Sequence, residues 1–110
     1  MIYSVTMKRV LEEKIKRLTR HSPQGSSAKI FWKDLSNALK ILAKNPVERG
    51  EILYTRKHVG LVEYASAFGP IGIQFAVNEE NGAVFITRLS ISGNHPYPQA
   101  FEELLNAELT

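Results

Sequence analysis

The fold is decided by the stretch FGPIGIQFAVNEENGAVFI, residues 68–86. The runs IGIQFAV and, continuing past this stretch, AVFITRLSI are rich in β-branched and aromatic residues, which favour strands. Between them stands Asn81-Gly82, a dipeptide that can take the positive φ values of tight hairpin loops. The stretch therefore predicts an antiparallel hairpin. Gly72 lies within its first strand, where it can pack or bend the strand but offers no side chain to a ligand.

The residues just before this hairpin extend the β-rich region towards the N-terminus. GEILYTR (50–56) and GLVEYASA (60–67) are β-rich runs, separated from each other and from the hairpin by Gly and Pro signals. The four runs together predict a meander of antiparallel strands. A further short alternating run, IYSVT at 2–6, predicts an opening strand.

Two amphipathic helices are predicted between the opening strand and the meander. Apolar residues recur at helical spacing in two groups: Met7, Leu11, Ile15 and Leu18, then Phe31, Leu35, Ala38, Leu39 and Leu42. The loop HSPQGSSAK at 21–29 separates the groups, and Asn45 before Pro46 ends the second helix. The helices therefore form a hairpin.

A last helix is predicted in QAFEELLNAEL (99–109), whose apolar residues again form a stripe. The predicted order is β-α-α-β-β-β-β-α, an α+β fold in one domain over residues 1–110. This size and a 44% hydrophobic content suit a single core.

The composition excludes several classes of protein and site. There is no run of 18 apolar residues and the N-terminus soon reaches charge, so we expect neither a membrane span nor a secretory signal, and a cytoplasmic location. The absence of cysteine excludes disulfides, thiolate metal sites and cysteine nucleophiles. With one Asp and His21, His58 and His95 far apart, we expect no metal and no cofactor.

The charge is divided unevenly along the chain. Residues 1–57 hold 13 Lys/Arg against 5 Asp/Glu, a net charge of +8, whereas residues 58–110 hold 1 against 6, a net charge of −5. Arg88 is the one basic side chain after Lys57. This asymmetry favours an anionic partner for the N-terminal half, either nucleic acid or an acidic peptide. The alternative is that these side chains simply solvate the two helices.

With these elements in place, the chain resembles the RelE/ParE superfamily of type II toxin–antitoxin toxins. The resemblance rests on the opening strand, the basic helical hairpin ending in ALKILAKNP, Gly50, the hairpin GPIGIQFAVNEENGAVFI and the closing YPQAFEELL. It implies a twisted antiparallel sheet packed against the N-terminal helices. It also implies a cognate antitoxin whose extended segment wraps the toxin, and a target that is either messenger RNA on the ribosome or DNA gyrase.

The chain departs from the nuclease members of this family at most of their catalytic positions. Metal-independent RNA cleavage needs a base, an acid and cations that stabilise the extra phosphate charge. The resemblance puts the hairpin arginine where Gly72 stands, a second arginine in SISG at 90–93, and the lysines of the preceding strand at Val62 and Tyr64. The family's tyrosine is retained as Tyr97. The resemblance thus implies a RelE/ParE-like toxin that lacks most of the RelE-type catalytic set.

Three residues remain as catalytic candidates: Tyr97, His95 and Arg88. Tyr97 stands between two prolines ahead of a helix, where an aromatic ring often packs instead. Histidine side chains suit acid–base chemistry near neutral pH, but His95 lies in a polar loop, where histidines are usually solvated. Arg88 suits a phosphate or an antitoxin carboxylate, or else a cross-strand pair with Glu63 or Glu79.

The candidates for nucleic-acid contacts are Arg49, Arg56 and Lys57. Arg56 and Lys57 directly follow a strand, although charges at strand ends also protect sheet edges. Trp32 is able to stack a base, but its apolar neighbours favour core or interface packing.

The sequence leaves three functions open. The first is a toxin neutralised by its antitoxin, the second is a non-toxic binding module on the same scaffold, and the third is an mRNA interferase with a relocated catalytic set. Whether the chain is an enzyme stays open with them. Since a sheet with an open edge needs cover, we expect a monomer or weak homodimer when the chain is unbound.

Overall fold

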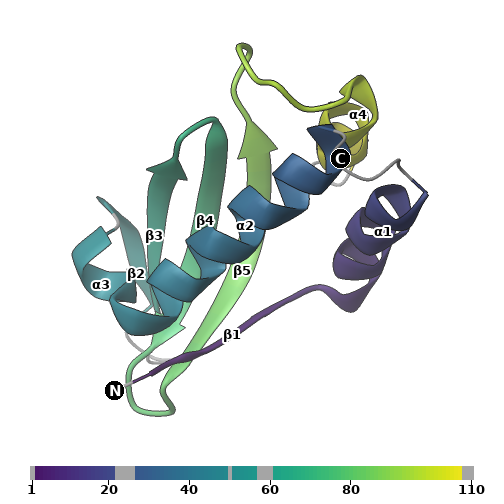
Figure 1. Ribbon diagram of the computed structural model, residues 1–110. Helices are drawn as coiled ribbons and strands as arrows, with labels where there is room; N and C mark the ends of the chain where they lie inside the picture. The colour runs from purple at the N-terminus through teal and green to yellow at the C-terminus, as the bar shows by residue number, and fades with distance from the viewer. Residues whose placement is uncertain (1, 22–26, 50, 57–60, 108–110) are drawn as a thin grey trace.

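The computed structural model describes residues 2–21, 27–49, 51–56 and 61–107 (Figure 1). The elements follow one another along the chain as β1 (Ser4–Met7), α1 (Arg9–Arg20), α2 (Ser27–Lys44), α3 (Pro46–Arg49), β2 (Glu51–Arg56), β3 (Leu61–Phe68), β4 (Ile71–Asn78), β5 (Ala83–Ile91) and α4 (Gln99–Ala107). The predicted α+β fold and element order are confirmed. The opening strand begins two residues later than expected, and α3 is an additional element.

The additional helix α3 has a local cause. Pro46 lacks an N–H and has a fixed φ, so it ends α2 at Lys44 but suits the first position of a new helical turn. The proline therefore separates two helices where the sequence predicted only the end of one.

The strands form one five-stranded sheet in the order β1-β5-β4-β3-β2. The meander from β2 to β5 is antiparallel throughout, as predicted. The sheet as a whole is mixed, because β1 pairs with β5 in parallel, with Ser4 opposite Ala83 and Met7 opposite Ile86. The expectation of an entirely antiparallel sheet was therefore wrong. β1 also covers part of the apolar strand β5, which is not an edge strand.

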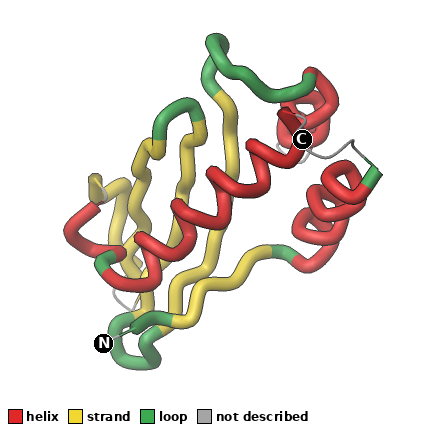
Figure 2. Tube along the Cα trace, in the orientation of Figure 1, coloured by secondary structure: helices red, strands yellow, loops and turns green. Residues whose placement is uncertain are grey.

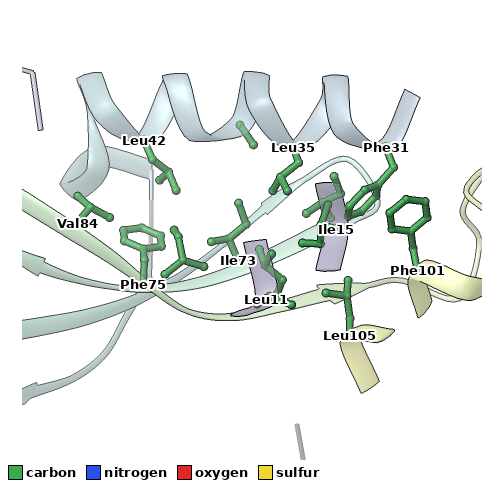
Figure 3. Close-up of a cluster of buried hydrophobic side chains, with 14 of the residues drawn as sticks. Leu11, Ile15, Phe31, Leu35, Leu42, Ile73, Phe75, Val84, Phe101 and Leu105 are labelled. Atoms are coloured by element: carbon green, nitrogen blue, oxygen red, sulfur yellow. The ribbon is translucent and has the colours of Figure 1, made fainter. Parts of the chain in front are cut away.

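The core lies between α2 and one face of the sheet (Figures 2 and 3). Phe31, Leu35 and Leu42 on α2 are fully buried, and they point at the sheet (Figure 3). Strands alternate their side chains between two faces, so every second residue of β4 faces this helix: Ile71, Ile73, Phe75 and Val77, all buried. Leu11 and Ile15 of α1 and Phe101 and Leu105 of α4 complete the same cluster.

Glycines with positive φ lie in the two hairpin turns that flank β4. Gly69, between β3 and β4, has φ 61°, and Gly82, between β4 and β5, has φ 63°. Asn81 does not share this conformation; its backbone N–H donates to Oδ1 of Asn78 at 3.1 Å. Of the predicted Asn-Gly pair, only the glycine therefore supplies the left-handed geometry.

None of the helices in the described ranges is both long and apolar enough to cross a membrane.

Alanine substitutions at two glycines test the backbone conformation of the turn between β3 and β4. Gly69→Ala should lower the free energy of unfolding by about 1–2 kcal/mol, since an L-residue pays that cost in the left-handed region. A Cβ at this position would have no atom within 4 Å, so the loss is a backbone effect. Gly93→Ala is the matched control, because a Cβ there is equally free and φ lies outside the left-handed region. Urea unfolding of both variants is the measurement, and equal losses would contradict the account.

Candidate functional site

The sheet has one face that the helices leave open. The buried apolar residues of α1, α2 and α4 belong to the cluster on the other face, so these three helices do not pack here. Cross-strand register arranges the outward-facing residues of β3, β4 and β5 in three rows: Ala67–Gly72–Ser90, Ala65–Gln74–Arg88 and Glu63–Ala76–Phe85. We take this open face as the candidate functional site.

A hollow of about 560 Å³ occupies the first two rows of this face. Its lining consists mainly of small side chains: Glu51, Ala65, Ser66, Ala67, Gly72, Ile73, Gln74 and Ser90. Gly72 and Ser90 are in close cross-strand contact, since a Cβ on Gly72 would lie 2.6 Å from Ser90 Oγ. Among the described residues, the lining holds one carboxylate and no Lys or Arg. Such a surface can accept hydrogen bonds from a ligand but is poorly suited to phosphate.

Arg88 lies beside this hollow, in the second row. It is exposed and stands opposite Gln74. Within the described residues it forms no ion pair with Glu63 or Glu79, so the cross-strand pair, one of the two roles that the sequence left open for Arg88, is absent. A register shift next to Gln74 makes Thr87 the extra residue of β5, and this bulge keeps Arg88 on the open face.

Tyr97 and His95 lie together, but on the helix side of the sheet. The Tyr97 hydroxyl donates to Oδ2 of Asp34 in α2 at 2.7 Å, and its ring packs edge-on against Phe31, with ring centroids 5.0 Å apart. The backbone N–H of Tyr97 donates to His95 Nδ1 at 3.1 Å. His95 Nε2 therefore carries the ring proton in the neutral form and donates to Glu102 Oε2 at 3.0 Å.

The Tyr97 hydroxyl holds its proton firmly. Burial, with the hydrogen bond to Asp34 as the second cause, raises the pKa of Tyr97 far above its ordinary value of 10.0. The protonated Tyr97 hydroxyl stays hydrogen-bonded to Asp34 and so fixes the loop before α4 on α2. The chemistry of the cluster is thus that of a packed anchor between α2 and α4.

The structure separates the three catalytic candidates. Tyr97 and His95 share one cluster, whereas Arg88 lies on the opposite face of the sheet. Sequence reasoning missed the two carboxylates that complete the cluster, Asp34 and Glu102; no local signal links Asp34 to a residue 63 positions away. Of the nucleic-acid candidates, Arg49 ends α3 and Arg56 ends β2. Lys57 lies outside the described residues, as does His58.

Within the described part of the chain, no three His, Asp or Glu side chains gather closely enough to hold a metal ion.

A double-mutant cycle tests the contact between Gly72 and Ser90. A glycine inside a strand lowers the free energy of unfolding by about 0.5–1 kcal/mol relative to alanine. We therefore expect Gly72→Ala to stabilise the Ser90→Ala variant by this amount. The same substitution should not stabilise the wild-type chain, because the Ser90 hydroxyl would have to move. Urea unfolding should give a coupling of about 0.5–1 kcal/mol. The control pair, Gly93→Ala with Ser90→Ala, should add independently. Additivity of the first pair would contradict the contact.

The Tyr97 anchor gives a pH-dependent prediction. Above pH 10.0 the unfolded chain loses the Tyr97 proton while the folded chain keeps it, so stability falls with a slope of up to about 1.4 kcal/mol per pH unit. Tyr97→Phe should remove the contribution of Tyr97 to this slope. The contribution of Tyr64, whose pKa is raised by its burial and by Glu79, remains. At neutral pH the variant should lose about 1–3 kcal/mol, because Asp34 loses its donor. Unfolding between pH 8 and pH 11 measures both, and an unchanged alkaline slope would refute the anchor.

Solved structures resemble this chain closely in fold. A chain of the archaeal RelE–RelB complex from Pyrococcus horikoshii OT3 matches with a TM-score of 0.59 and 18% identity, covering 86% of this chain and 100% of that one. A chain of the toxin–antitoxin complex RelBE2 from Mycobacterium tuberculosis matches with a TM-score of 0.58 and 17% identity, covering 86% and 95%. No family model matches the sequence, and no curated protein does. At these identities the likeness shows architecture alone: this chain shares its α+β fold with the matched chains of the two complexes.

Proposed function

We propose that this chain is the toxin of a type II toxin–antitoxin system, held inactive by a cognate antitoxin in the cytoplasm. The fold supports this proposal, since two structural neighbours are chains of RelE–RelB or toxin–antitoxin complexes. The charge of the N-terminal half supports it as well: a net charge of +8 over residues 1–57 suits an acidic antitoxin or a nucleic-acid-containing target such as the ribosome. DNA gyrase is the alternative target.

We further propose that the toxin acts without the RelE-type phosphate site. The observation that carries this step is the hollow at Gly72 and Ser90, in whose lining the described residues include no cation. Removing one preorganised donor from a transition-state site costs about 100- to 1,000-fold in rate. A relocated set is poorly supported, because Arg88 lies on the opposite face from His95 and Tyr97. Growth inhibition then comes from binding a macromolecule, and RNA is a suitable target for the basic helices.

The hollow also supports a second candidate, a non-toxic binding module on the same scaffold. An open face without a catalytic cation suits a protein that keeps its partner but has lost its toxicity. The two functions differ in one observable, growth on induction of the isolated chain.

The test is induction of the chain with and without the product of the adjacent small gene. The proposal predicts growth arrest with the chain alone and restored growth when the two are co-expressed. Leu35→Asp is the control variant, since a carboxylate at this fully buried position prevents folding, and it should not inhibit growth. Normal growth despite soluble accumulation of the chain would refute toxicity and favour the binding module.

A further inference from the structure

A second concave site lies between α1 and α2, away from the open face of the sheet. It has a volume of about 460 Å³ and is lined by Lys16, Thr19 and Arg20 of α1 and by Lys29 and Trp32 of α2. We call it the hairpin groove. It lies where the last turns of α1 run beside the first turns of α2 (Figure 1). Neither the hollow nor the Tyr97 cluster shares a residue with it.

The groove joins an aromatic ring to three cations. Trp32 is half-buried and packs against the core, yet it also lines the groove. The Lys16 ammonium lies 5.9 Å from its ring centroid, near the outer limit of a cation–π contact. Arg20 is exposed and Lys29 half-buried, so positive charge stands on both walls. The groove residues include no carboxylate, although Lys16 also pairs with Glu12 at 3.2 Å on the neighbouring turn.

Among the described residues, the floor of the groove offers no free polar group. Thr19 is buried, and its hydroxyl donates to the Ile15 carbonyl at 2.9 Å. Of the described groove residues, the cations at the rim are therefore the hydrogen-bonding partners for a polar ligand. A flat apolar body with negative charge at its edge fits this arrangement.

We propose that the hairpin groove binds one nucleotide unit of a single-stranded nucleic acid, with its base stacked on Trp32 and its phosphates paired with Lys16, Arg20 and Lys29. Bases stack on aromatic side chains in proteins that bind single strands, and Lys and Arg track the backbone. The volume is that of a small-molecule pocket. An acidic helix would instead need a longer groove with apolar anchors at successive turns. The proposal does not depend on toxicity.

Trp32 makes the site directly observable because it is the one tryptophan of the chain. Titration with a hexanucleotide, RNA in one arm and DNA in another, should quench the Trp32 fluorescence with an affinity that falls as salt rises. Polyphosphate, which has charge but no base, should compete without comparable quenching. A hexaglutamate peptide should bind more weakly than either oligonucleotide. Tighter binding of that peptide would overturn the proposal in favour of an acidic protein partner.

Charge variants separate the groove from general electrostatic attraction. The triple variant K16Q/R20Q/K29Q should weaken binding of a labelled hexanucleotide at least tenfold. It should also reduce the slope of log K against log salt by about 2, because each phosphate contact on a single strand contributes about 0.7. The matched control, R9Q/K40Q/K44Q, removes the same charge from exposed positions outside the groove. Equal weakening by the two triples would refute a localised site.

A substitution of the ring tests stacking. Trp32→Leu should weaken binding about 5- to 100-fold, the usual effect of losing one base–aromatic stack. Trp32→Phe keeps a stacking surface and should restore affinity to within a few-fold. Fluorescence anisotropy of the labelled strand reads both variants, and circular dichroism verifies their folding. Equal affinity of the Leu and Phe variants would overturn the stacking role.

Discussion

The structure depends on the packing of α2 across the inner face of the β4–β5 hairpin. Phe31, Leu35 and Leu42 are fully buried there, and this contact joins segments far apart in the sequence. Hydrogen bonds from other segments also fix both halves of this helix. The Tyr3 N–H donates to the Ala43 carbonyl at 2.7 Å near its end, and Tyr97 donates to Asp34 nearer its start. The helix thereby fixes the first strand and the last loop on the same body.

Because of this packing, the two faces of the sheet have different roles. The apolar face packs in the core. Tyr97 and His95, in the loop after β5, lie on that side and form part of the anchor between α2 and α4. The other face remains open, but its small residues and single carboxylate make a hollow with no cation among the described residues of its lining. Positive charge is concentrated instead on α1 and α2. Our proposal therefore places phosphate recognition on the helical hairpin and not on the sheet.

Local patterns predicted most of the fold, whereas the site depended on contacts between distant segments. The spacing of Leu11 and Ile15, the alternation in β4 and the glycine of the NEENG turn each act within a few residues, so the helices and meander could be predicted. The parallel pairing of β1 with β5 could not, because Ser4 meets Ala83 only after the intervening chain has folded. The same holds for Asp34 with Tyr97 and for Lys16 with Trp32. The bulge at Thr87 has no signature in sequence, yet it decides that Arg88 faces outward.

The central proposal is that this scaffold, which shares its fold with chains of RelE–RelB complexes, carries no RelE-type phosphate site on its open sheet face. Primer extension on messenger RNA in a purified translation system, with the isolated chain added, tests this claim most directly. We predict no cuts beyond those in reactions without the chain, even at protein concentrations equal to that of the ribosome. Defined cuts within codons on the ribosome, dependent on the folded chain, would contradict it.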